Sequence, residues 1–166
     1  EKPVDTPCLE PNCVSGLNHR QKTHKTSPHA AVPYPQNYKK KQLDKKNDII
    51  NIGCFGAVRP LKNHLIQAIA SIKFADAIGK KLHFHINSDR VEQKGEPILN
   101  NLIATFEQLK DKGHRLIHHK WSVREQFIEL CSTMDIGIQV SFNETFNIVG
   151  ADIVSQGVPL VVSPEI

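Results

Sequence analysis

The sequence of 166 residues contains no apolar run that approaches the about 20 residues needed to span a bilayer. It also lacks a secretory signal, because its first residues are polar and proline-rich rather than a basic start followed by an apolar segment. The chain begins with Glu1 rather than Met, so we expect it to be a piece of a longer protein. We therefore expect a cytoplasmic location, and we leave open whether the full-length protein lies at the inner face of a membrane.

Cysteine is scarce as well. Four cysteines in 166 residues are too few and too scattered for a disulfide scaffold. Cys54 lies in an apolar strand segment and Cys131 lies on an apolar helix face. Both are expected to be small buried hydrophobic residues of a protein from a reducing compartment.

Several motifs that would specify a cofactor or a nucleophile are missing. Cys8 and Cys13 precede His19 and His24, but this spacing fits no standard zinc finger. No Asp-x-Asp triplet is available for a divalent ion, and no Gly-x-Gly-x-x-Gly is available for a nicotinamide cofactor. No Ser-His-Asp order or Cys-His pairing indicates a nucleophile. We expect neither a metal nor a cofactor.

The formal charge of +4 is distributed unevenly along the chain. Residues 1–47 hold nine Lys or Arg against four Asp or Glu, a charge of +5, whereas residues 48–166 hold twelve against thirteen, a charge of −1. The first segment also holds six of the ten prolines and is predicted to be an irregular linker or extension. Its lysine clusters could contact nucleic acid or anionic lipid, but a solvated linker is favoured, and we expect no nucleic-acid partner.

From Asp48 onward, apolar residues follow strand and helix periods in turn. Strands are expected over residues 49–55, 82–86, 115–118, 135–140 and 158–162. Helices are expected over residues 61–78, 96–112 and 145–156, with a further helix capped by Ser122 and Glu125. This alternation predicts an α/β fold with a doubly wound, mainly parallel sheet in one domain, residues 48–166, which is truncated at its C-terminus. A receiver- or flavodoxin-like sheet is the plainer alternative.

In such sheets ligands bind beyond the carboxyl ends of the strands, at the switch point. The loops that end there are expected over residues 56–63, 87–90, 118–122 and 141–148. The last loop carries Glu144, and Asp152 follows eight residues later, about two turns into the next helix. The N-terminus of that helix offers free N–H groups and a positive dipole end, which suit a phosphate.

The same segment resembles a known signature. It begins with Ser141-x-x-Glu144-x-Phe146 and has a second acid at Asp152, followed by Gly157-x-Pro and apolar residues. This pattern is similar to the nucleotide-sugar-binding signature of retaining family 4 glycosyltransferases. These enzymes are built from two Rossmann-like domains in the GT-B arrangement. The resemblance covers residues 48–166 and matches the C-terminal, donor-binding domain. It implies a nucleotide-sugar donor and an N-terminal acceptor domain that is missing here.

The resemblance also implies roles for the residues of the signature. Glu144 would contact hydroxyls of the donor sugar near the reacting carbon and is the catalytic candidate. Asp152 stands where the family has Glu, and it would accept hydrogen bonds from the ribose. Asn147 replaces a common Gly, and the amides of Asn147, Ile148 and Val149 are the candidates for diphosphate contacts. We expect Phe146 and Val149 to pack against the sheet.

The first loop resembles the family's Gly-Arg-x-x-x-x-Lys loop, in which two cations neutralise the donor diphosphate. Lys62 is in register with that lysine, six residues after Gly56, whereas Ala57 replaces the arginine. Arg59 could reach the phosphate from two residues further on. Asn63 is expected to cap the following helix.

The loop of residues 118–122 is where the family seats the base. His119 and Trp121 are the candidate base-binding residues there, although Trp121 could equally close the edge of the sheet. The other histidines, His64, His83, His85 and His114, are expected to be structural or exposed.

We therefore predict the donor-binding domain of a retaining glycosyltransferase that moves a sugar from a nucleoside-diphosphate sugar to an acceptor. The isolated chain is expected to bind nucleotide weakly and to transfer nothing. Two alternatives remain: a non-catalytic or degenerate nucleotide- or glycan-binding module, and a nucleotide-sugar epimerase domain.

Overall fold

The computed structural model describes residues 41–44, 46–144 and 146–163. The cysteine and histidine residues that suggested zinc lie outside these residues, as does the extension before residue 41. The described residues between 41 and 48 form no helix or strand. The Lys41 amide donates to the carbonyl of Gly157 at 2.9 Å, so this short segment contacts the folded part of the chain.

Five parallel strands form a single sheet in the described part of the chain. They are β1 (Ile49–Gly53), β2 (Lys81–Asn87), β3 (Arg115–His119), β4 (Ile136–Gln139) and β5 (Leu160–Val162). Their order, β3-β2-β1-β4-β5, is the Rossmann order. It differs from the flavodoxin order and excludes the receiver- or flavodoxin-like alternative.

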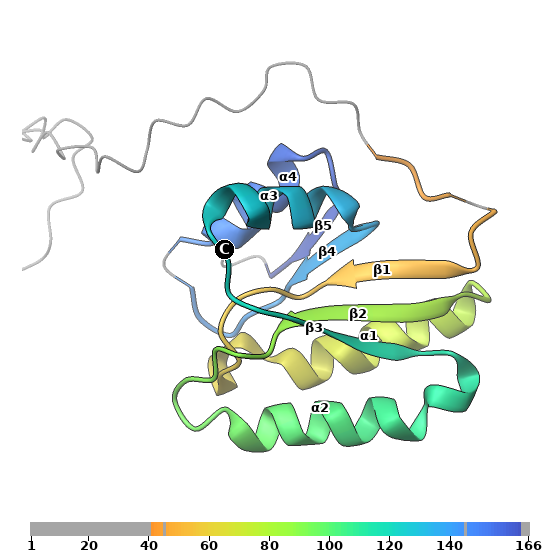
Figure 1. The fold of residues 1–166 in the computed structure, drawn as a ribbon, viewed down its shortest axis with the longest axis horizontal. Coiled ribbons are helices and arrows are strands. Elements are labelled where there is room, and N and C mark those ends of the chain that lie inside the picture. Colours follow the sequence, from red (N-terminus) through yellow and green to blue (C-terminus); the bar gives the residue numbers. More distant parts are fainter. Residues whose placement is uncertain (1–40, 45, 145, 164–166) are drawn as a thin grey trace, which may run out of the picture. The chain divides into compact units, whose positions relative to one another are not determined.

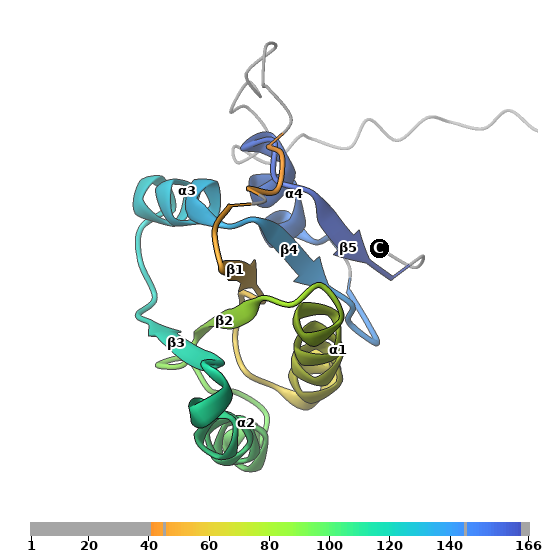
Figure 2. The ribbon, with the colours of Figure 1, turned by 90° about the vertical axis from the view of Figure 1, so that its right-hand side faces the viewer.

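Helices cover both faces of this sheet. α1 (His64–Ala77) and α2 (Glu96–Gln108) lie on one face, and α3 (Arg124–Thr133) and α4 (Ile148–Ser155) lie on the other (Figures 1 and 2). Two short 3-10 helices, η2 (Pro60–Lys62) and η3 (Lys110–Lys112), precede α1 and follow α2. The predicted α/β, doubly wound, parallel fold is confirmed.

The apolar side chains that produced the sequence pattern form one cluster on each face of the sheet. The cluster under α1 and α2 includes Ile50, Ile52, Leu82, Phe84, Ile86, Leu102 and Phe106. The cluster under α3 and α4 is built from Phe55, Cys131, Met134, Ile153 and Val158. Cys54 and Cys131 are buried free thiols, as predicted, and burial raises the pKa of each to about 12.

Three predicted helix starts differ from the structure. Asn63 occupies the N-cap position of α1, but its φ of 56° places it in the left-handed region and its side chain makes no cap bond. The predicted capping box at Ser122 is wrong, because α3 begins at Arg124 after an extended Val123. The signature helix begins at Ile148 rather than residue 145, because Asn147 caps it through its own side chain.

The switch point lies between β1 and β4. The chain leaves β1 toward α1 on one face and leaves β4 toward α4 on the other face. The loops after these two strands therefore border the same crevice at the carboxyl edge of the sheet, on the left in Figure 1. Both loops contain residues that the sequence identified as candidates.

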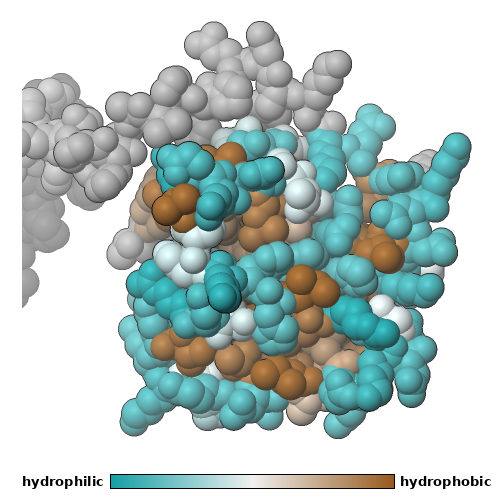
Figure 3. Space-filling view, in the orientation of Figure 1, coloured by the Kyte–Doolittle hydropathy of each residue, from teal (hydrophilic) through white to brown (hydrophobic). Residues whose placement is uncertain are grey.

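The surface is mixed, with one exception at α1. On the face seen in Figure 3, apolar side chains form small patches that are bordered by hydrophilic ones. α1 is apolar on its outer side as well, where Ile66, Ile69 and Phe74 are 58%, 44% and 41% exposed. Phe74, Ile138 and Val161 help to line an apolar hollow of about 240 Å³ beside it. Among the described helices, none has the length and apolar character needed to cross a membrane.

Candidate functional site

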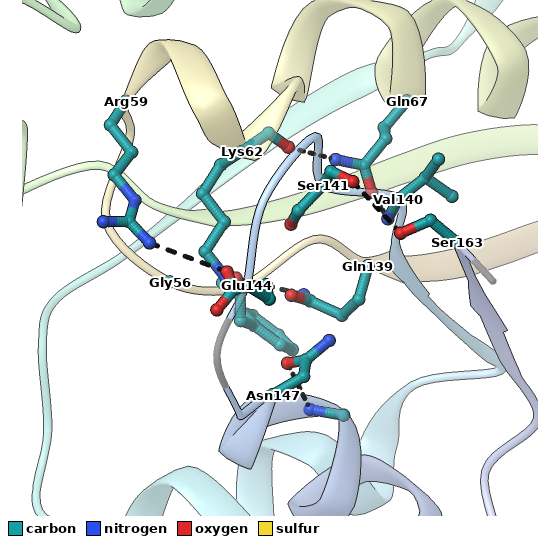
Figure 4. Close-up of polar contacts among 12 residues, drawn as sticks. Gly56, Arg59, Lys62, Gln67, Gln139, Val140, Ser141, Glu144, Asn147 and Ser163 are labelled. Carbon is teal, nitrogen blue, oxygen red and sulfur yellow. Dashed lines mark hydrogen bonds and ion pairs between the residues drawn. The ribbon is translucent and has the colours of Figure 1, made fainter. Parts of the chain in front are cut away.

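Lys62, Arg59 and Glu144 meet at the switch point (Figure 4). The Lys62 Nζ forms an ion pair with Glu144 Oε1, and Arg59 Nη2 lies 3.6 Å from the same oxygen. The side chains of Lys62 and Glu144 are only 10% and 9% exposed, and that of Arg59 is 26% exposed. Three residues that the sequence assigned to one ligand are thus brought together by two loops that lie about 80 positions apart in the chain.

Hydrogen bonds between the two loops hold these charges in place. The Val140 amide donates to Gln67 Oε1 at 2.8 Å, and Gln67 Nε2 donates to the Lys62 carbonyl. The Phe142 amide donates to the carbonyl of Leu61 at 2.9 Å. The first turn of α1 therefore fixes the end of β4 and the backbone of Lys62 together.

Buried polar side chains surround the charges. Gln139, Ser141 and Asn147 are 1%, 5% and 8% exposed. Gln139 Nε2 donates to the Phe55 carbonyl at 3.0 Å, but its Oε1 has no hydrogen-bond partner among the described residues. The same holds for the Ser141 hydroxyl and for Asn147 Nδ2. Since buried polar atoms are nearly always paired, these three groups are candidates for contacts with a ligand.

The N-terminus of α4 lies next to this cluster. Asn147 has a φ of −83°, so it does not need the backbone freedom of the glycine that it replaces, and its Oδ1 accepts from the Gly150 amide at 2.9 Å. The Ile148 amide donates to the Phe146 carbonyl at 3.0 Å. The expected packing of Phe146 against the sheet is wrong: it is 72% exposed, because α4 starts late and leaves Phe146 in the preceding loop. Val149, in contrast, packs partly against the cluster under α3 and α4.

A cavity of about 280 Å³ adjoins the cluster. It is lined by Gly56, Asn87, Trp121, Ser122, Arg124, Phe127, Ile148, Val149 and Asp152. A Cβ placed on Gly56 would lie 3.7 Å from Lys62 Nζ, so the Lys62 ammonium lies close to this part of the cavity wall. Four predicted site residues, Trp121, Ile148, Val149 and Asp152, therefore share one cavity, and Lys62 stands at its border.

Asp152 is held by a residue that the sequence did not identify. Its side chain is 5% exposed, and Oδ1 accepts from Arg124 Nη2 of α3 at 2.7 Å. Glu144 and Asp152 are thus engaged by different cations. Arg124 gave no signal in the sequence, because it lies 28 residues before its partner and on another helix.

Trp121 forms part of the cavity wall. Its backbone amide donates to both carboxylate oxygens of Asp89, at 2.9 and 2.8 Å, and the Arg90 guanidinium lies 4.2 Å from the centre of its ring. The indole is half exposed. It is therefore held from the loop after β2 in a position where a planar group in the cavity could stack on it.

His119 does not belong to the described lining of this cavity. Its ring stacks on His85 with centroids 5.1 Å apart, and His85 Nδ1 lies 2.8 Å from His119 Nε2. Burial lowers the pKa of His85 to about 4, with His119 and His83 acting in the same direction. This pair is a part-buried contact between β2 and β3, in which His85 is buried and His119 is half-buried.

His64 is fully buried at the start of α1, and neither ring nitrogen has a hydrogen-bond partner within the part of the chain that is described. Burial, followed by the nearby charges of Lys62 and Arg59, lowers its pKa to about 4. Within residues 41–44, 46–144 and 146–163, no group of three or more His, Cys, Asp or Glu is arranged to hold a metal ion.

Solved structures of other proteins are similar in fold to this chain, although no family model and no curated protein sequence matches it. The OtsA apo structure superposes with a TM-score of 0.56 and 17% identity, over 71% of this chain and 30% of that one. The second structure is of a trehalose-6-phosphate synthase, studied with bisubstrate glycomimetics for enzymatic glycosyltransfer with retention. It superposes with a TM-score of 0.55 and 15% identity, over 71% of this chain and 31% of that one. The chain thus corresponds to about a third of each neighbour. At this identity the likeness shows the fold, which supports the predicted Rossmann-like half of a GT-B protein.

Proposed function

We propose that residues 48–166 bind the donor of a retaining, family 4 type glycosyltransferase, as the C-terminal domain of a two-domain enzyme. The observation that carries this proposal is the convergence of Lys62, Arg59 and Glu144 at the switch point, next to a cavity of about 280 Å³. Ligands of doubly wound sheets bind at that place. The similarity in fold to a synthase that performs glycosyltransfer with retention is consistent with it.

Each part of a nucleoside-diphosphate sugar has a matching group in this arrangement. The diphosphate would lie at Lys62, Arg59 and the N-terminus of α4, where fixed positive charge stabilises a leaving diphosphate without a metal. The sugar would lie at Glu144, which accepts hydrogen bonds from hydroxyls. The nucleoside would occupy the cavity, with its ribose at Asp152 and its base on Trp121. The acceptor would come from the other domain.

A nucleotide-binding module without transfer activity is the second candidate. It is favoured by the Arg124–Asp152 ion pair, which occupies the acid that would bind the ribose. The replacement of the expected loop arginine by Ala57 points the same way. In this case the chain would bind nucleotide, but the complete protein would not transfer sugar.

The experiment uses Trp121, which is the only tryptophan in the chain. Uridine, guanosine and adenosine diphosphates are titrated into the protein, and binding is followed by tryptophan fluorescence and by calorimetry. At least one of them is expected to change the fluorescence, and Lys62→Ala is expected to weaken its binding at least about tenfold. Lys73→Ala, which removes an exposed lysine of α1, is the control and should leave the affinity unchanged.

The results separate the candidates. If none of the three nucleotides binds, the nucleoside-diphosphate proposal is wrong. Binding without transfer by the complete two-domain protein would favour the module. Sugar transfer by the 166-residue chain alone would contradict the requirement for an acceptor domain.

A further inference from the structure

The charges proposed to bind two different parts of the donor bind each other in the structure. Lys62 and Arg59 are assigned to the diphosphate and Glu144 to the sugar, yet both cations contact the Glu144 carboxylate. The carboxylate thus stands where a phosphate oxygen would have to stand. A diphosphate that binds these cations competes with Glu144 for them.

The loop around Glu144 has an unusual distribution of exposure. The carboxylate of Glu144 is buried, whereas Phe142 and Phe146 on either side of it are 70% and 72% exposed. This is the reverse of what the solvation of these side chains favours. The position of the carboxylate is therefore set by its ion pairs rather than by packing of the neighbouring aromatic side chains, and loss of those ion pairs would free the Glu144 side chain.

Partners are available for a carboxylate that leaves the cations. In Figure 4 the Asn147 side chain points from the start of α4 toward Gln139 and Glu144. Asn147 Nδ2 and the Ser141 hydroxyl can donate hydrogen bonds, and neither has a partner among the described residues. The hydroxyls of a bound sugar would supply further donors.

We infer that Glu144 is a specificity-determining residue that exchanges partners when the donor binds. Before binding, it neutralises Lys62 and Arg59. The donor diphosphate then takes over both cations, and the released carboxylate binds the hydroxyls of the sugar. This inference rests on the proposed function and adds a mechanism by which the site distinguishes a donor from a spent nucleoside diphosphate.

The distinction follows from what the released carboxylate can bind. A complete donor and a bare diphosphate both compete with Glu144 for the cations. Only the donor brings sugar hydroxyls that stabilise the displaced carboxylate. Glu144 therefore lowers the affinity for the bare diphosphate and favours its release after the sugar has been transferred.

The test uses inorganic pyrophosphate, which has neither base nor sugar and so probes the cations alone. Its affinity is measured by calorimetry for the 166-residue wild type and for Glu144→Gln. We expect the variant to bind pyrophosphate about tenfold more tightly, equivalent to about 1.4 kcal/mol. Glu144→Asp keeps the charge and should remain close to wild type. Glu107→Gln removes the same charge from the exposed face of α2 and controls for the overall field.

Folding of each variant is checked by circular dichroism, and Glu144→Ala provides a second way to remove the carboxylate. If the wild type binds pyrophosphate and neither neutral variant binds it more tightly, the exchange of partners is refuted. The proposed function then still stands on nucleotide binding at Trp121. If neither the wild type nor the neutral variants bind pyrophosphate, the cations are not a phosphate site, and both proposals fail.

Discussion

The Lys62–Glu144 ion pair allows a quantitative test that needs no ligand. The two side chains are about a tenth exposed, and Arg59 lies 3.6 Å from the same carboxylate oxygen. A double-mutant cycle with Lys62→Met, Glu144→Gln and the double variant isolates their interaction. Glu144→Gln leaves the buried Lys62 ammonium without its carboxylate, and Lys62→Met leaves Glu144 with Arg59 alone, whereas the double variant removes both charges.

The structure sets the expected size of the effect. Removal of one partner from a fully buried pair costs about 3–5 kcal/mol, whereas replacement of both is often close to neutral. Here slight exposure and the remaining contact with Arg59 reduce the cost, so we expect each single variant to lose about 2 kcal/mol and the double variant about 1 kcal/mol. The coupling energy is then about 3 kcal/mol, at the upper end for contacting residues.

Urea unfolding followed by circular dichroism and by Trp121 fluorescence measures these values, provided that the two transitions coincide. The exposed pair Glu107–Lys110 on α2 is the control and should show no comparable coupling. A coupling of about 0.5 kcal/mol or less for Lys62 and Glu144 would be that of a solvated surface pair. It would refute the reasoning that Glu144 neutralises the cations and must be displaced from them.

Three further predictions concern the fold. Burial holds the pKa of His64 and His85 at about 4, below the value of about 6.5 expected in the unfolded chain. Between about pH 4 and about pH 6.5 the unfolded chain therefore binds more protons than the folded protein. The free energy of unfolding should fall as the pH drops from about 6.5 to 4, and His64→Leu should reduce this slope, as measured by urea unfolding at several pH values. Gly137→Ala should destabilise the protein by about 1–3 kcal/mol in the same assay, because its Cβ would lie 2.7 Å from Ile153 Cγ2. Phe74→Glu interrupts the exposed apolar side of α1 and should reduce self-association of the chain, so that it stays monomeric at higher concentration. Light scattering measures this, and unchanged association would show that this side of α1 does not mediate it.

The fold could be predicted because its signal is local. Each strand is a short segment with apolar residues at its centre, and each crossover is long enough for one helix, so the alternation predicts a doubly wound sheet. The helix starts were less accurate because they depend on contacts between distant segments. The backbone amide of Trp121 is held by Asp89 from the loop after β2, and the chain runs extended through Val123 before α3 begins.

The candidate site was predictable only where the residue spacing carries information. Lys62 and Glu144 were identified from their positions in two motifs, and the structure places them in contact. The partners of the site residues were missed because no spacing links them. Arg124 reaches Asp152 from another helix. Gln139 is a single polar residue at the end of an apolar strand, and its place in the site becomes evident only when the strands are paired. The exposure of Phe146 was missed because it depends on where α4 starts.

The hydrogen bonds between the two loops have a mechanical consequence. The Val140 amide is bonded to Gln67, and the Phe142 amide is bonded to Leu61, the residue before Lys62. The loop after β4 is therefore linked by hydrogen bonds to the segment that leads into α1, and these bonds oppose a hinged separation of the two. We expect adaptation to a bound molecule in the tip of the loop and in side-chain rotamers, rather than in the hydrogen-bonded backbone. A second domain that closes over this crevice would then meet a surface whose shape is already set.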